Sequence, residues 1–147
     1  MDVGDKVAIV TGAGRGIGRA VALELGHAGA RVIVNYRKSA EPALALADEI
    51  DGVAVQADVS TPEGCQKLID AAQDLGSLDI LVNNAGITRD MLMLRMSDEE
   101  WQQVLDVNLG AVFRMCRSAA VVMLSQRRGS IINITSVSGI RGNPGQA

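Results

Sequence analysis

The residues Thr11-Gly12-Ala13-Gly14-Arg15-Gly16-Ile17-Gly18 directly follow the short apolar run 6–11 and open the helical pattern 17–28. A strand, a glycine-rich turn and a helix in this order form the first unit of a dinucleotide-binding fold. The free N–H groups and partial positive charge of a helix N-terminus favour phosphate groups. We therefore expect the four glycines, with Arg15 and Ile17, to bind a dinucleotide. A glycine-rich turn that binds nothing is the alternative.

The spacing of this motif is T-G-x-x-x-G-x-G, and each of its glycines is expected to have a distinct structural role. Gly12 permits the tight turn, and Gly14 and Gly16 let the backbone approach a diphosphate without a clash from Cβ. Gly18 allows the helix to pack closely on the strand.

The rest of the chain continues to alternate strand and helix. Strands are expected at 6–11, 31–35, 53–57, 79–83 and 130–135, and helices at 17–28, 39–50, 60–75 and 98–126. Capping boxes at 60–63 and 97–100 mark two helix starts, and the glycine-rich tail 139–147 is expected to be a loop. The alternation predicts an α/β fold, a Rossmann-type doubly wound parallel sheet, in one dinucleotide-binding domain over 1–147.

Composition excludes several classes of protein. The 147 residues are 48% hydrophobic and 21% charged, which is enough apolar surface for a core. Aromatic residues are only 2% and the formal charge is −3, so a nucleic-acid partner is not expected. The longest uncharged run, 129–140, is too short to span a membrane.

Metal binding and secretion are not expected either. His27 is the only histidine, and Cys65 and Cys116 stand alone, without metal-ligand spacing. Two buried thiols are typical of a reducing cytosol. The start Met1–Asp5 carries two acids and no apolar region, so no signal peptide is expected and the location is cytoplasmic.

The end of the second strand bears on the choice of cofactor. An NAD site usually has an acidic residue there, which accepts from the ribose 2′-OH, but the sequence is Asn35-Tyr36-Arg37-Lys38. Arg37 and Arg15 could both face a 2′-phosphate, which favours NADP. The alternative is that Arg37 and Lys38 are simply solvated.

Two further strand ends complete the expected site. Asp58-Val59 follows the third strand, where a carboxylate can accept from an adenine amino group or cap the next helix. Asn83-Asn84-Ala85-Gly86 follows the fourth strand. Its small residues would let the cofactor ribose lie against the backbone, and its asparagines would tie strands together.

Taken together these residues resemble the short-chain dehydrogenase/reductase family. The resemblance is carried by Thr11–Gly18, Asp58, Asn83–Gly86, Asn108 and Asn133–Gly139. Within the family, the stretches 84–90 and 91–101 look most like the bacterial 3-oxoacyl-acyl-carrier-protein reductases. The resemblance implies NADPH-dependent reduction of a 3-oxoacyl thioester, linked to acyl carrier protein, in fatty acid biosynthesis.

The resemblance also assigns roles to single residues. Ser136 would hydrogen-bond the substrate carbonyl, and Ser138 would be a structural hydroxyl. Asn108 would hold a water of a proton relay by bending the long helix locally. Arg127 and Arg128 could dock the acidic carrier protein, or only complement the helix C-terminus.

One departure from the family is decisive for activity. Such enzymes need a Tyr-x-x-x-Lys pair, but the only tyrosine is Tyr36, and Ala40 stands four residues on. The resemblance therefore implies the N-terminal part of a reductase, truncated before its general acid and inactive by itself. Another family member acting on a steroid, sugar or small alcohol is one alternative. A non-catalytic module that binds a nucleotide or a partner is the other.

Within the helix 98–126, the stretch 109–124 is apolar nearly all round, which indicates burial on more than one side. We expect one face to cover the sheet, and Val112, Met115, Ala119 and Met123, or a neighbouring stripe, to face outward. The fifth strand, Ser130–Thr135, is expected to leave an open β edge. Both features predict a homo-oligomer.

Overall fold

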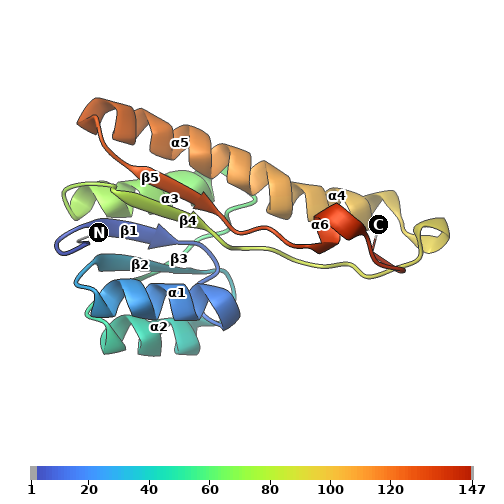
Figure 1. The fold of residues 1–147 in the computed structure, drawn as a ribbon, viewed down its shortest axis with the longest axis horizontal. Coiled ribbons are helices and arrows are strands. Elements are labelled where there is room, and N and C mark those ends of the chain that lie inside the picture. The colour runs from blue at the N-terminus through green and yellow to red at the C-terminus, as the bar shows by residue number, and fades with distance from the viewer. Residues whose placement is uncertain (1–2, 147) are drawn as a thin grey trace.

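The computed structural model describes residues 3–146, which form a parallel sheet covered by helices on both faces (Figure 1). The strands are β1 (Val7–Val10), β2 (Arg31–Tyr36), β3 (Val53–Gln56), β4 (Ile80–Asn83) and β5 (Ser130–Asn133). Their order is β3-β2-β1-β4-β5, and all neighbours are parallel. The chain therefore builds outward from β1 in both directions, which confirms the doubly wound sheet.

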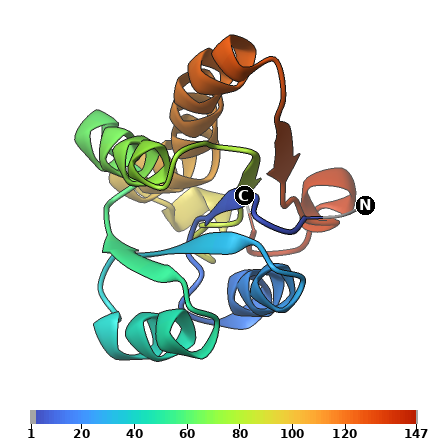
Figure 2. The ribbon, with the colours of Figure 1, turned by 90° about the vertical axis from the view of Figure 1, so that its left-hand side faces the viewer.

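Two pairs of helices cover the two faces of the sheet. Figure 2 shows α1 (Gly16–His27) and α2 (Ala40–Glu49) on one face, and α3 (Pro62–Asp74) and α5 (Ala111–Gln126) on the other. Successive strand residues alternate between two cores, so Ile9 packs on the α3/α5 side and Val10 on the α1/α2 side. This explains why the strand pattern is continuously apolar.

The long helix is continuous but contains one irregular turn. Its parts are α4 (Asp98–Leu105), the π-helical turn η2 (Asp106–Gly110) and α5. The expected capping box at its start is present, because Ser97 Oγ accepts from the Glu100 N–H and Glu100 Oε2 from the Ser97 N–H. A 3₁₀ turn, η1 (Met93–Arg95), precedes it.

Two local predictions were wrong. The cap of α3 is Thr61, whose hydroxyl accepts from the Gly64 N–H, while Ser60 bonds Asp58 instead of closing a capping box. The tail is not entirely loop, since Ser138–Arg141 forms a short helix, α6.

The orientation of α5 also corrects the sequence prediction. Met115, Ala119 and Met123 were expected to face outward, but they are buried with Ala111 against the core. Val112 is half-buried. The outer face of the long helix is instead a neighbouring stripe, formed by Leu109 of η2 and by Phe113, Val121 and Leu124 of α5. Alanine and methionine alternate every four residues on this inner face, which contacts α3 and β4. The sequence alone does not say which of two apolar faces does so.

Within the part of the chain that the structure describes, the helix Asp98–Gln126 is long and apolar enough to cross a membrane by length and composition alone. It has 29 residues and a mean hydropathy of 1.4 in its most apolar stretch. The core helix of a soluble protein also meets this criterion of length and composition. One face of this helix contacts α3 and β4. Arg114 and Arg117 interrupt the apolar sequence of this helix, so it contains no long uncharged run.

Candidate functional site

A cleft of about 570 Å³ opens at the carboxyl ends of β1 to β4. It is lined by eleven residues that the sequence singled out, namely Gly12, Gly14, Arg15, Gly16, Ile17, Arg37, Asp58, Val59, Asn84, Ala85 and Gly86. It is also lined by Asn35, Tyr36, Lys38, Ser39, Pro42, Ala57, Ile87 and Val107. The strand order reverses at β1, so the cleft lies at the switch point where open α/β sheets bind ligands.

The glycine turn brings backbone close to this cleft. Gly12 and Gly16 have φ of +63° and +57°, in the left-handed region that favours glycine. A Cβ on Gly12 would lie 3.0 Å from the Cα of Ala85. No side chain caps the N-terminus of α1, so the N–H groups of its first turn are available to a ligand.

Gly18 acts beneath the turn and does not line the cleft. A Cβ at this buried position would overlap the side-chain nitrogen of Asn84 and lie 2.7 Å from the Gly12 carbonyl oxygen. Gly18 therefore allows the close packing of α1 that the spacing predicted.

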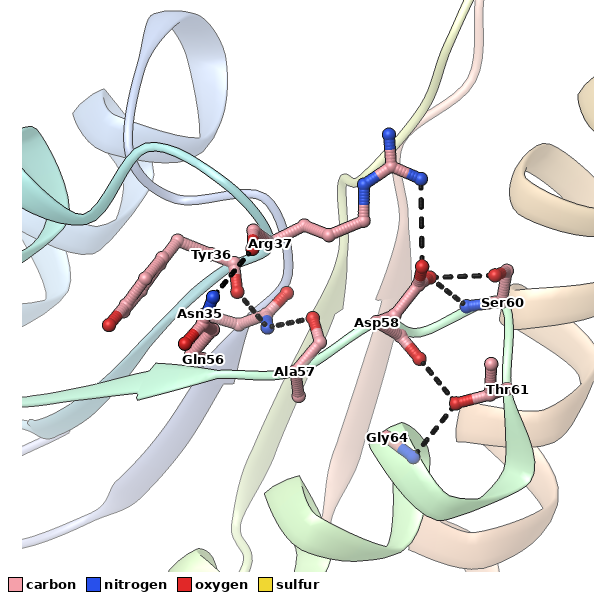
Figure 3. A network of polar contacts seen from close by, with 9 residues as sticks. All are labelled: Asn35, Tyr36, Arg37, Gln56, Ala57, Asp58, Ser60, Thr61 and Gly64. Atoms are coloured by element: carbon pink, nitrogen blue, oxygen red, sulfur yellow. Dashed lines mark hydrogen bonds and ion pairs between the residues drawn. The ribbon is translucent and has the colours of Figure 1, made fainter.

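Asn35 is a site residue to which sequence reasoning gave no role. Its Oδ1 accepts from the Gly12 N–H at 3.1 Å. Its Nδ2 donates to the Ala57 carbonyl at 3.1 Å, as Figure 3 shows. Its backbone carbonyl accepts from the Ala13 N–H. This buried amide thus fastens the glycine turn to the ends of β2 and β3. The signal was a single polar residue at the end of a continuous apolar strand.

The loop after β4 is fastened to β1 by Thr11 and Asn84. The Thr11 hydroxyl accepts from the N–H groups of Asn84 and Ala85, at 2.9 and 3.0 Å. The Asn84 amide donates to the Thr11 carbonyl at 2.9 Å. In the neighbouring pair of strands, Asn83 donates to Asn133 at 2.9 Å. The asparagines therefore tie strands together, as predicted.

Arg37 and Asp58 form an ion pair beside the cleft. Nη1 of Arg37 lies 3.6 Å from Oδ2 of Asp58, and the two side chains are 46% and 39% exposed (Figure 3). Oδ1 of Asp58 accepts from the Ser60 hydroxyl at 2.6 Å and the Ser60 N–H at 3.0 Å. Partial burial opposes ionisation, but the Ser60 bonds and Arg37 outweigh it and lower the Asp58 pKa below its usual 3.8.

The side chain of Asp58 does not cap α3, because Thr61 does. The backbone carbonyl of Asp58 accepts from the Thr61 hydroxyl, so this residue still shapes the helix start. Arg15, the second candidate for a 2′-phosphate, is exposed at the cleft and makes no ion pair with the residues that the structure describes.

Asn108 contacts the cleft wall, whereas Ser136 does not line the cleft. Asn108 lies in the π turn, where its Oδ1 accepts from the Ile87 N–H and its Nδ2 donates to the Ile87 carbonyl, both at 2.9 Å. Ser136 is exposed beyond β5, and its hydroxyl accepts from the Ser138 N–H. Ser138 in turn accepts from the side chain of Asn143.

The two arginines after α5 differ in their surroundings. Arg128 donates to Oδ1 of the buried Asp79 at 2.8 Å, so it has a structural partner. Arg127 is exposed and ends the helix with φ of +55°.

No cluster of three metal-ligating side chains occurs among residues 3–146. Both cysteines are free. Cys65 is buried, and burial raises its thiol pKa. Cys116 is only half-buried, which corrects the expectation of two buried thiols.

A doubly wound sheet, with a glycine turn and an uncapped helix N-terminus at its switch point, is the arrangement typical of dinucleotide-binding folds. Comparison with known families places it further: the family described as short chain dehydrogenase matches residues 6–147, and the chain belongs to that family.

Curated relatives share about half of the sequence. The chain is 50% identical over 97% of its length to the 3-oxoacyl-[acyl-carrier-protein] reductase FabG of Staphylococcus aureus strain Mu50. It is 51% identical over the same share to the 3-oxoacyl-[acyl-carrier-protein] reductase of Synechocystis. The FabG of Staphylococcus epidermidis strain RP62A is 46% identical over 97% of the chain. The chain spans 60% of the length of the first two relatives and 61% of the third.

Proposed function

We propose that the cleft binds NADP, and that the whole enzyme reduces an acyl-carrier-protein-linked 3-oxoacyl thioester to the 3-hydroxyacyl form in fatty acid biosynthesis. The observation that carries the cofactor assignment is the composition of the cleft. The glycine turn and Arg37 line the same cleft, and Asp58 is the one carboxylate among its described lining residues. The names of the relatives support the substrate part.

The residues fit a dinucleotide. The glycine turn and the first N–H groups of α1 would hold the diphosphate, because a side chain there would fill the space that the phosphates need. Asp58 and Val59 would contact the adenine, and Asn84, Ala85 and Gly86 the ribose. Bound NADPH would supply the hydride.

The preference for NADP follows from charge at the end of β2. Arg37 and Arg15 line the cleft, and no acidic residue follows β2 to accept from a 2′-OH. Titration of the chain with 2′,5′-ADP and with 5′-AMP tests this, and tighter binding of 2′,5′-ADP is expected. Arg37→Asp should reverse the preference. Equal affinities in the unchanged protein would contradict the NADP assignment.

On the substrate side, the Ser136 hydroxyl would donate to the carbonyl oxygen that becomes an alkoxide. Asn108 would hold a relay water and, through Ile87, position the cleft wall. The family's Tyr-x-x-x-Lys pair is not among the 147 residues, because Ala40 stands four residues after Tyr36. We therefore expect the 147-residue chain by itself to be inactive toward an acetoacetyl thioester with NADPH, since loss of a positioned general acid removes about 10²–10⁴-fold.

Docking of the carrier protein is assigned to Arg127 and Arg128. Arg127 is exposed, and the Arg128 side chain is 58% exposed despite its bond to Asp79. An acidic surface could therefore reach both. Arg127→Glu should weaken binding of carrier protein without unfolding the chain, because Arg127 makes no ion pair with the described residues.

We also propose a cytoplasmic homo-oligomer. The two free thiols fit a reducing compartment. The apolar outer stripe lies on the same long helix as Asp98, Glu99 and Glu100 at one end and the exposed Arg117 further along. Two antiparallel copies of this helix would pair acid with base around the stripe.

The residue four positions after Tyr36 is Ala40, so the 147 residues contain no Tyr-x-x-x-Lys pair. This observation favours a second candidate function, a non-catalytic nucleotide-binding module. A relative acting on a small alcohol or ketone instead of a thioester is the other alternative, and activity of the whole enzyme with both substrate types would distinguish them.

A further inference from the structure

Two side chains at the end of β3 contact Arg37. Nε2 of Gln56 donates to the Arg37 carbonyl at 3.0 Å and fixes its backbone. The carboxylate of Asp58 holds the other end, with Oδ2 3.6 Å from Nη1 (Figure 3). The guanidinium proposed to bind a 2′-phosphate is thus already paired with a carboxylate of the same chain.

The charges around the cleft make this pairing consequential. Arg15, Arg37 and Lys38 line the cleft, and Asp58 is its only acidic lining residue. Ser60 donates two hydrogen bonds to Oδ1 and leaves Oδ2 for Arg37. Asp58 is therefore oriented as a counterion, not left as a freely rotating surface acid.

We propose that Asp58 is a specificity-determining residue: it is the counterion of Arg37 in the free cleft, and the 2′-phosphate of the ligand takes its place. This inference depends on the proposed NADP site and deepens it. Binding of a 2′-phosphorylated nucleotide then includes the cost of breaking the Arg37–Asp58 pair, whereas binding of a nucleotide without that phosphate does not. Asp58 therefore limits the preference for the phosphorylated ligand.

The experiment is calorimetric titration of the chain with 2′,5′-ADP and with 5′-AMP. The quantity compared is the ratio of the two dissociation constants. Any contact between Asp58 and adenine is present in both ligands, so its loss cancels in the ratio. For Asp58→Asn the preference for 2′,5′-ADP should rise about two- to fivefold, the effect expected from removing a half-exposed ionic competitor.

Matched variants separate this exchange from a general change of charge. Asp74→Asn removes the same charge from the exposed far end of α3 and should leave the ratio unchanged. Arg37→Ala should lower the preference to what Arg15 alone supplies, and adding Asp58→Asn to Arg37→Ala should not raise it again. Circular dichroism checks each fold, and Asp58→Ser serves if Asp58→Asn does not fold.

The outcomes distinguish the inference from the proposed function. A strong preference that Arg37→Ala lowers, but that Asp58→Asn leaves unchanged or lowers, overturns the exchange and leaves the NADP site standing. An equal rise in Asp74→Asn also overturns it. A ratio near one in the unchanged chain, or no binding of either ligand, overturns both the site and the exchange.

Discussion

Gly18 has no Cβ, and this allows α1 to pack closely against the glycine turn and the loop after β4. A Cβ there would overlap Asn84 and crowd the Gly12 carbonyl oxygen, although alanine is the better helix former by about 1 kcal/mol. The steric term is larger, so Gly18→Ala should lower the free energy of unfolding by about 1–3 kcal/mol. Urea unfolding measures this.

Gly139→Ala is the matched control for this substitution. Gly139 lies in α6, and nothing would contact an added Cβ within 4 Å. It should change stability little. Equal effects of the two substitutions would show that Gly18 does not set the distance between α1 and the β4 loop.

Asp79 makes stability depend on pH. Its carboxylate accepts from the Val7 N–H, the Ser77 hydroxyl and Arg128, at 3.1, 2.6 and 2.8 Å. Burial opposes ionisation, but these bonds outweigh it and lower the Asp79 pKa below 3.8. Because the folded pKa lies below the unfolded one, the stabilisation is present above the unfolded pKa and is lost as pH falls through the folded pKa.

Asp79→Asn should therefore cost about 1–3 kcal/mol at pH 7, since hydrogen bonds to a charged group are replaced by weaker ones. The difference in free energy of unfolding between the unchanged protein and Asp79→Asn should become smaller as pH falls below about 4. Urea unfolding at pH 7 and pH 3 provides the comparison. A gap of constant size would mean that the charge of Asp79 does not contribute.

Among the elements, the π turn η2 is the one with a clear consequence for the cleft. It presents Asn108, whose amide forms two bonds with the backbone of Ile87. Asn108→Ala should speed hydrogen exchange of the Ile87 amide by about fivefold, because a hydrogen bond of about 1 kcal/mol is lost. Leu109→Ala, in the same turn but 64% exposed, is the control and should leave that amide protected.

The elements also show what can and cannot be predicted from sequence. Strands and helices were predictable within a few residues, because period, caps and glycines are local signals. The start of α3 was misread, since Ser60 and Thr61 are both good caps and only the Ser60–Asp58 bond decides between them. The inner face of α5 and the role of Asn35 could not be predicted either, because both depend on what lies opposite in space.

For the whole molecule, the exposed apolar surface governs association. The outer stripe of the long helix is uncovered among the described residues; it consists of Leu109, Phe113, Val121 and Leu124. All four residues of β5 are exposed, with Ile131 and Ile132 at 38% and 48%. Surfaces of this kind pair with one another or with an added strand. Sedimentation of the purified chain at micromolar concentration should therefore give a dimer or larger species.

Substitutions on each surface identify which one pairs. Phe113→Lys with Leu124→Lys should shift sedimentation toward monomer if the helices meet, and Ile132→Lys should do so if the β edges meet. A 15.4 kDa monomer in the unchanged chain would contradict the prediction.

The position of β1 in the middle of the sheet has a consequence for synthesis. β1 pairs with β2 on one side, but on the other side it pairs with β4, where Ala8 lies opposite Ile80. A ribosome adds about 5–20 residues per second, so β4 is synthesised roughly 4–15 s after β1. During that interval the backbone N–H and C=O groups on one edge of β1 have no partner strand. Pausing of translation before Ile80 would lengthen the exposure, and a chaperone would be needed most in that interval.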